Sequence, residues 1–81
     1  MTEKTITISI PEGLTAKSAT ALIAKANDFP CSIFLESNAR RVNCKSLLGV
    51  VSLGLKCGDS VVLSASGADE TAAAEALAAM L

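Results

Sequence analysis

Two hydroxyl side chains, Thr15 and Ser46, stand where helices are predicted to begin. A serine or threonine in that place can cap the helix by accepting a hydrogen bond from a free backbone N–H group. If a kinase reaches it, the added phosphate meets the positive end of the helix dipole and the same N–H groups. Capping alone is the commoner role, so the neighbouring residues decide which of the two applies.

Ser46 is followed by Leu47, Leu48 and Val51 at short helical spacing, and Gly54 stands where a short helix is expected to end. A short helix must be anchored by packing, but we expect Leu47 and at least part of Leu48 to stay exposed. An exposed aliphatic cluster beside a switchable charge is typical of a surface that docks a partner. The alternative is that all three side chains are ordinary core residues.

The sequence contains no histidine. This absence removes the commonest general base and every Ser-His or Cys-His nucleophile pair, so we expect the protein not to be an enzyme. The three cysteines, Cys31, Cys44 and Cys57, are widely separated and form no Cys-x-x-Cys pair. We therefore expect no metal site and no cofactor. The thiols are predicted to be reduced and mostly buried, as in a cytoplasmic protein.

Length and composition predict one domain spanning residues 1–81. Hydrophobic residues make up 51% of the chain but the only aromatic residues are Phe29 and Phe34, so the core is expected to be aliphatic. The net charge of −1 provides no basic field for nucleic acid or for an anionic membrane. We expect no leader peptide, and no apolar run approaches the roughly 18 residues that cross a bilayer.

Hydrophobic periodicity predicts four strands and three helices. The strands are expected at 5–10, 31–36, 41–44 and 60–65, and the helices at 16–27, 46–54 and 71–81. Thr15, Ser46 and Asp69 are the predicted N-caps, and Asn38 is expected in a left-handed conformation in a hairpin turn. The order β-α-β-β-α-β-α with alternating strands predicts an α+β fold. It is an open-faced sandwich in which three helices cover one face of a four-stranded antiparallel sheet.

Two stretches of the sequence point to a family. Residues 42–55 read VNCKSLLGVVSLGL and residues 64–70 read SASGADE. They resemble HPr, the small phosphocarrier of the bacterial phosphoenolpyruvate-dependent sugar phosphotransferase system, and most closely its form in low-GC Gram-positive bacteria. The resemblance extends over nearly the whole chain, and it implies the same open-faced fold in a cytoplasmic protein.

The first predicted helix departs from the HPr pattern. HPr proteins carry a phospho-accepting histidine in a motif like Gly-[Leu/Ile]-His-[Ala/Thr]-Arg-Pro-Ala, whereas residues 13–19 here read Gly-Leu-Thr-Ala-Lys-Ser-Ala. Thr15 thus replaces the histidine, Lys17 the arginine and Ser18 the proline. A threonine hydroxyl has no base beside it here, and its phosphate ester is far more inert than a phosphoramidate. Lysine also lacks the bidentate fork of arginine, so ordinary phosphocarrier activity is not expected.

The second HPr site is intact at Ser46. The resemblance implies that this serine is phosphorylated by an ATP-dependent HPr kinase/phosphorylase, and that the modified protein binds a LacI-type catabolite repressor as corepressor in carbon catabolite repression. The sequence is similar to the histidine-less catabolite repression HPr, with threonine in place of glutamine at the lost position. The partner-binding residues proposed on this basis are Lys45, Leu47, Leu48, Val51, Lys17 and Thr20.

Alternatives remain open at both helix starts. Thr15 is either a simple cap, part of a vestigial anion site with Lys17 and Ser18, or an unusual phosphoryl acceptor. If Thr15 is a phosphoryl acceptor, the protein is an atypical phosphocarrier. The other alternative is a degenerate family member that binds sugar phosphotransferase proteins without being modified. Around Ser46, the expected local cations are Lys45 and either Lys17 or Arg40.

Overall fold

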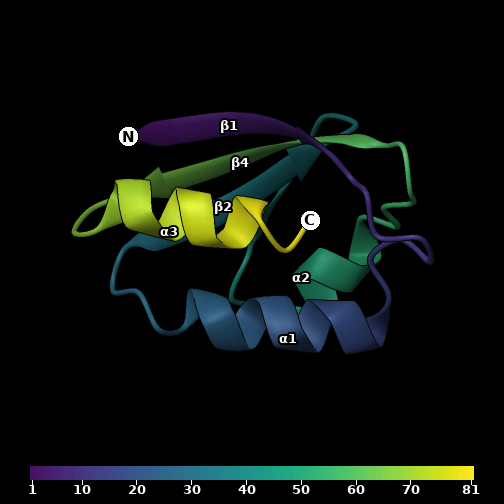
Figure 1. The fold of residues 1–81 in the computed structure, drawn as a ribbon, viewed down its shortest axis with the longest axis horizontal. Coiled ribbons are helices and arrows are strands. Elements are labelled where there is room, and N and C mark those ends of the chain that lie inside the picture. The colour runs from purple at the N-terminus through teal and green to yellow at the C-terminus, as the bar shows by residue number, and fades with distance from the viewer.

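Figure 1 shows the fold in the computed structural model, which describes residues 1–81. The elements are β1 (Thr2–Thr7), α1 (Ala16–Ala26), β2 (Ser32–Ser37), β3 (Arg40–Asn43), α2 (Leu47–Ser52), β4 (Ser60–Ser66) and α3 (Glu70–Ala78). Their order is the predicted β-α-β-β-α-β-α.

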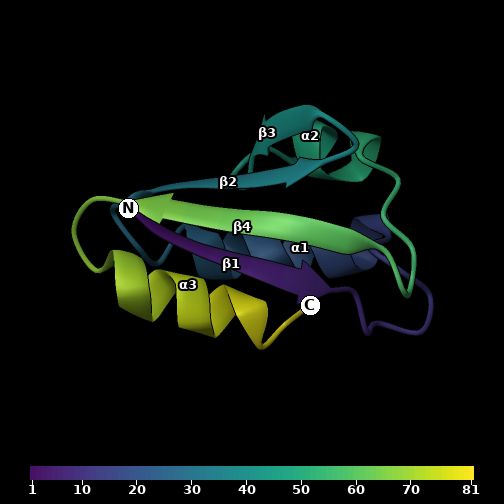
Figure 2. The same ribbon diagram turned by 90° about the horizontal axis from the view of Figure 1, so that it is seen from above.

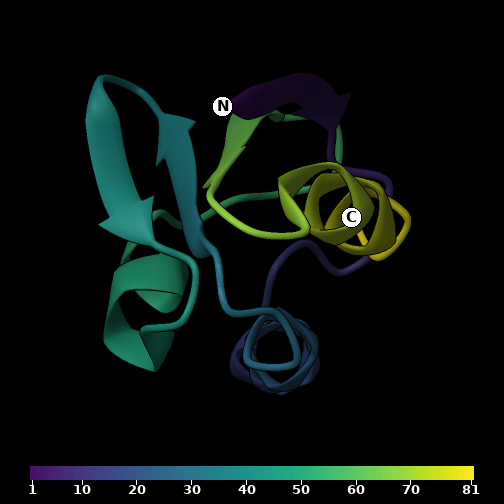
Figure 3. The same cartoon turned by 90° about the vertical axis from the view of Figure 1, so that its left-hand side faces the viewer.

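The four strands form one sheet in the order β1-β4-β2-β3, and every neighbouring pair is antiparallel. All three helices lie on one face of this sheet, and the other face carries no element (Figures 2 and 3). The prediction of an α+β open-faced sandwich is confirmed. No helix of the structure is long and apolar enough to cross a membrane.

The core lies between the helices and the inner face of the sheet, and it is almost entirely aliphatic. Strand β4 contributes Val61, Leu63 and Ala65 at alternate positions, as its sequence pattern predicted. Helix α1 contributes a stripe that includes Ala19 and Leu22 at a spacing of three. Four helical alanines are buried in the same core cluster: Ala19, Ala26, Ala73 and Ala74.

The predicted bounds of the first strand were wrong by three residues. The register pairs Thr2 with Ala65 and Thr7 with Ser60, so β1 follows the length of its partner β4. The alternation continues beyond the ladder, because the Ile8 amide donates to the Asp59 carbonyl at 2.8 Å and the Ile8 side chain is buried. Sequence alternation therefore marked which side chains face the core, but not where strand pairing ends.

The start of α3 also differs from its prediction. Asp69 occupies the N-cap position, but it has a left-handed φ of 61° and its side chain makes no capping bond. The turn is held instead by Glu70, whose Oε1 accepts a hydrogen bond from the Gly67 amide at 3.3 Å. The helix buries Ala73, Ala74 and Leu77 against the core.

The β2–β3 hairpin turn agrees with its prediction. Asn38 and Ala39 both have positive φ, at 53° and 64°, which is the pattern of a two-residue type I′ turn. Such a turn sets a tight register, and Ser37 pairs directly with Arg40.

Candidate regulatory and docking site

Ser46 is exposed and caps α2, as the sequence predicted. Its backbone is extended (φ −108°, ψ 117°), and its Oγ accepts a hydrogen bond from the Gly49 amide at 3.3 Å. The turn into the helix is built by Asn43, whose side-chain Oδ1 accepts from the Lys45 amide at 2.8 Å and whose carbonyl accepts from the Ser46 amide at 3.0 Å. This turn holds the serine hydroxyl at the surface of the molecule.

Helix α2 exposes the aliphatic side chains that the sequence analysis singled out. Leu47 is 45% exposed, Leu48 85% and Val51 39%; we call these three residues the α2 patch. The helix is anchored by Val50 and Leu53, which are buried. The sequence analysis missed these two anchors, although their spacing of three was a signal for them.

Gly49 allows α2 to lie close to β3. A Cβ atom at this position would stand 3.2 Å from the Val42 Cβ and 3.4 Å from the Ser46 Oγ. The absence of a side chain at Gly49 thus avoids close contacts with Val42 and with the capping hydroxyl of Ser46. It also permits the short distance between α2 and the edge strand β3 at Val42.

The two cations nearest to α2 are both engaged by neutral groups. The Lys45 ammonium donates to the Phe29 carbonyl at 2.8 Å. The Arg40 guanidinium donates to the Ser52 carbonyl at 2.9 Å and to the Ser52 hydroxyl at 3.0 Å. Ser52 ends α2, so the structure places Arg40 at the other end of the helix from Ser46.

Thr15 caps α1 through a long hydrogen bond. Its Oγ1 accepts from the Ser18 amide at 3.4 Å, and the Ser18 hydroxyl lies at 3.4 Å as well. No carboxylate or amine is hydrogen-bonded to the Thr15 hydroxyl, so no base activates it. On the same helix Lys17 and Thr20 are exposed, and the Thr20 hydroxyl donates to the Ala16 carbonyl at 2.8 Å.

The loop that leads into α1 is packed on the segment that leaves α2. The Leu14 amide donates to the Leu55 carbonyl at 2.9 Å. Gly13 has a φ of +77°, and a Cβ there would stand 2.7 Å from the Leu55 carbonyl oxygen and 2.9 Å from the Lys56 Cα. This contact brings the start of α1 beside α2, as Figure 1 shows. The helices that carry the predicted residues therefore lie in contact with each other.

The cysteines take no part in this site. Cys31 and Cys44 are buried, Cys57 is exposed, and all three are free. Burial raises the pKa of the Cys44 thiol to about 12, and the nearby Lys45 ammonium offsets only part of that effect. Cys44 is thus a neutral core thiol at physiological pH. No cluster of three or more histidine, cysteine or acidic side chains is placed to hold a metal ion.

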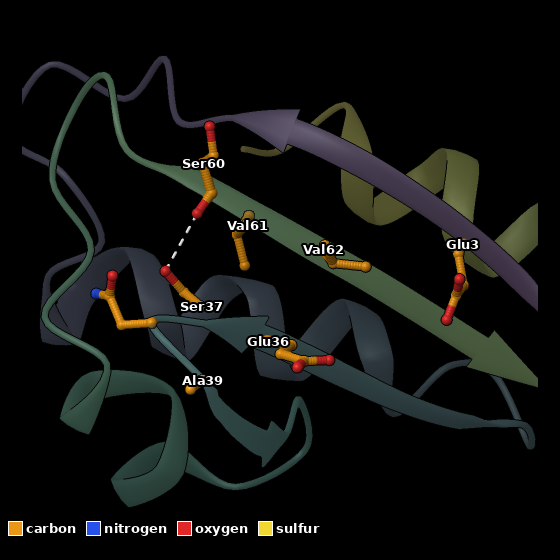
Figure 4. A pocket seen from close by; sticks show the side chains of 8 residues that line it. Glu3, Glu36, Ser37, Ala39, Ser60, Val61 and Val62 are labelled. Carbon is orange, nitrogen blue, oxygen red and sulfur yellow. Dashed lines mark hydrogen bonds between the residues drawn. The ribbon is translucent and has the colours of Figure 1, made fainter.

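A hollow of about 450 Å³ lies on the uncovered side of the sheet (Figure 4). Its lining includes the carboxylates of Glu3 and Glu36, and the Ser37 hydroxyl donates to the Ser60 carbonyl at 3.1 Å beside it. Of its lining residues only Asn38 was singled out from the sequence, and that was for its turn conformation and not for a site.

The whole chain matches known proteins. A family model described as the PTS HPr component phosphorylation site matches residues 2–81. The HPr-like protein Crh of Halalkalibacterium halodurans is 37% identical over 81 residues, which cover 100% of this chain and 96% of that protein. The phosphocarrier protein HPr of Lysinibacillus sphaericus is 40% identical over 81 residues, covering 100% and 92%.

A solved structure agrees with these relatives. The crystal structure of a phosphocarrier protein HPr from Bacillus anthracis superposes with a TM-score of 0.96 at 35% identity, covering 99% of this chain and 95% of that one. The fold and the matched range define a small domain of the sugar phosphotransferase system. The chain belongs to the HPr family, and the resemblance read from its sequence is confirmed.

Proposed function

We propose that this chain is a regulatory member of the HPr family that is switched at Ser46. In this proposal an HPr kinase/phosphorylase phosphorylates the serine, and the modified protein then binds a LacI-type catabolite repressor as corepressor. The observation that carries the proposal is the exposed Ser46 hydroxyl at the start of α2, directly before the exposed Leu47 and Leu48. The protein acts in the cytoplasm, and it catalyses no reaction of its own.

The electrostatics around Ser46 support a switch. A phosphate adds about −1.5 to −2 charges at pH 7. Lys45 is held by the Phe29 carbonyl, and Arg40 is held by Ser52 at the far end of α2. Neither cation is hydrogen-bonded to the Ser46 hydroxyl, so the negative charge of the phosphate remains available to a cation of the partner. The α2 patch beside it supplies the apolar contact area that a charged group alone lacks.

The first helix supports a regulatory role over phosphoryl transfer. Thr15 has no hydrogen-bonded base, and its only side-chain partner is Ser18. A hydroxyl in this state is a weak nucleophile. The curated relatives include proteins named HPr-like protein Crh from two organisms, which favours the regulatory branch of the family for this chain.

The kinase reaction tests this proposal. The protein is incubated with HPr kinase/phosphorylase and ATP, and the phosphate is located by mass spectrometry. We expect a single phosphate on Ser46, and no phosphate on the Ser46→Ala variant. The Ser52→Ala variant is the matched control, because Ser52 is an exposed hydroxyl on the same helix. An unmodified Ser46 under conditions that modify a true HPr would rule the proposal out.

A second candidate is an atypical or degenerate phosphocarrier that binds proteins of the sugar phosphotransferase system. It is favoured by the exposed Lys17 and Thr20 on α1, a helix that packs against α2. Incubation with enzyme I and phosphoenolpyruvate separates the two candidates. Phosphate transfer to Thr15 would establish the atypical carrier. Binding to these proteins, with neither Thr15 nor Ser46 modified, would establish the degenerate one.

A further inference from the structure

The outer edge of β3 is open. β3 is the last strand of the sheet, and Figure 3 shows no element beyond it on that side. Helix α2 lies under the strand and leaves its edge uncovered (Figures 2 and 3). An open strand edge presents backbone donors and acceptors to any extended chain that approaches.

The register shows which backbone groups are free. Ser37 and Arg40 flank the two-residue turn, so they form a hydrogen-bonded pair, and such pairs alternate along an antiparallel ladder. The Cys44 amide donates to the Ile33 carbonyl at 2.9 Å, which agrees with this alternation. The N–H and C=O groups of Arg41 and the N–H group of Asn43 therefore point away from β2.

Two fixed positive charges flank these free groups. The Arg40 guanidinium is held by the Ser52 carbonyl and hydroxyl. The Arg41 guanidinium carbon lies 4.4 Å from the centre of the Phe34 ring. Both of these partners are neutral, so neither guanidinium is used in an ion pair within the chain.

No acidic side chain of the molecule forms an ion pair with these two arginines. Glu36 lies opposite Arg41 in the register but forms no ion pair with it. The one ion pair in the structure joins the N-terminal amine to Glu70. The edge is therefore basic as well as open, and its two arginines are already held in place before any partner arrives.

From these observations we propose that the β3 edge binds an extended acidic segment of a partner protein, which adds a strand to the sheet. The free groups of Arg41 and Asn43 supply the backbone hydrogen bonds. Acidic side chains of the added strand pair with Arg41 on the face of the sheet away from α2, and the side chains that alternate with them face α2, where Arg40 is bound to Ser52. A second copy of this chain is disfavoured, because it would bring arginines against arginines.

This interaction is independent of Ser46. It uses backbone groups of β3, and the protein needs no phosphate for it. Helix α2, which carries the α2 patch, nevertheless lies directly beneath β3 (Figure 3). A partner that docks on the patch therefore reaches the edge with a neighbouring extended segment.

Amide hydrogen exchange on the unphosphorylated protein tests the proposal. The probe is an end-capped peptide of about six residues that alternates glutamate with valine. We expect exchange of the Arg41 and Asn43 amides to slow as the peptide is added, while the amides of β1 on the opposite edge stay unchanged. The Arg41→Glu variant should bind the peptide about three- to tenfold more weakly. Lys25→Glu is the matched control, since Lys25 is an exposed cation on α1, and it should bind as the wild type does.

Four results would overturn the proposal. The first two are unchanged exchange of the Arg41 and Asn43 amides at saturating peptide, and protection of the β1 amides equal to that of the β3 amides. The third is that a peptide with lysine in place of glutamate binds as tightly as the glutamate peptide. The fourth is protection of the β3 amides that rises with protein concentration when no peptide is present. A peptide methylated on the backbone nitrogens that face β3 should lose the effect. Binding of that peptide with full affinity would also contradict strand addition.

Discussion

The Gly49 amide donates its hydrogen bond to the Ser46 hydroxyl at 3.3 Å, so the residue proposed for phosphorylation is also the cap of α2. One side chain thus has a structural role before modification and a signalling role after it. The two roles predict different results for different substitutions at Ser46.

Substitutions at Ser46 separate capping from signalling. Ser46→Ala removes the cap and should lower the free energy of unfolding by about 0.5–1 kcal/mol, because the lost bond is long and exposed. Ser46→Asp keeps an acceptor and places a negative charge at the helix start, so its stability should stay within about 0.5 kcal/mol of the wild type. Urea denaturation measures both values. An equal loss in the two variants would show that the hydroxyl does not stabilise α2.

The α2 patch is predicted to matter for binding and not for stability. Leu48 is 85% exposed, so Leu48→Ala should change the free energy of unfolding by less than about 0.5 kcal/mol. Leu53, the C-cap residue of α2, is buried, and Leu53→Ala should cost about 2–5 kcal/mol. With the phosphorylated protein, Leu48→Ala should weaken repressor binding by more than about 1 kcal/mol in calorimetry. Unchanged binding would remove the patch from the interface.

Two glycines with positive φ provide a matched pair. Gly13→Ala would put a Cβ 2.7 Å from the Leu55 carbonyl oxygen, so the contact between the two loops must open. We expect a loss of about 3 kcal/mol or more. Gly58 has a φ of +95° with no atom within 4 Å of the added Cβ, so Gly58→Ala should cost only the backbone strain, about 1–2 kcal/mol. Equal losses in thermal unfolding would mean that close packing at Gly13 contributes nothing.

Glu70 makes stability depend on pH in the acidic range. Hydrogen bonds from the N-terminal amine and from the Thr2 hydroxyl lower the pKa of this carboxyl from 4.5 to about 2. The folded state therefore favours the ionised form. This contribution is fully present above about pH 4.5 and is lost as the pH falls toward 2.

The Glu70→Gln variant tests that contribution. Its glutamine cannot titrate, so its free energy of unfolding should fall less between pH 5 and about pH 2.5 than that of the wild type. The other carboxylates are present in both proteins and cancel in the comparison. Parallel pH profiles for the two proteins would contradict the role of the Glu70 ion pair.

Much of the fold followed from periodicity and capping. The alternation in β4 identified the buried side chains, and the caps at Thr15 and Ser46 were found from residue type and position. These features are local, so the sequence contains them directly. The left-handed Asn38 in the hairpin turn was predicted for the same reason.

The features that were missed depend on tertiary contacts. The ends of β1 follow its partner β4, which lies far along the chain. Asp69 was expected to cap α3, but its left-handed backbone directs the side chain away from that role. Arg40 is the first residue of β3, and it reaches Ser52 at the end of α2, a contact that no local pattern indicates.

The affinity of the LacI-type repressor for this protein before and after kinase treatment tests the central claim most directly. The account predicts that phosphorylation at Ser46 strengthens binding by about tenfold or more, a gain of about 1.4 kcal/mol, and that Ser46→Ala shows no change after the same treatment. Equal affinity for the modified and unmodified proteins, with the phosphate confirmed on Ser46, would contradict it.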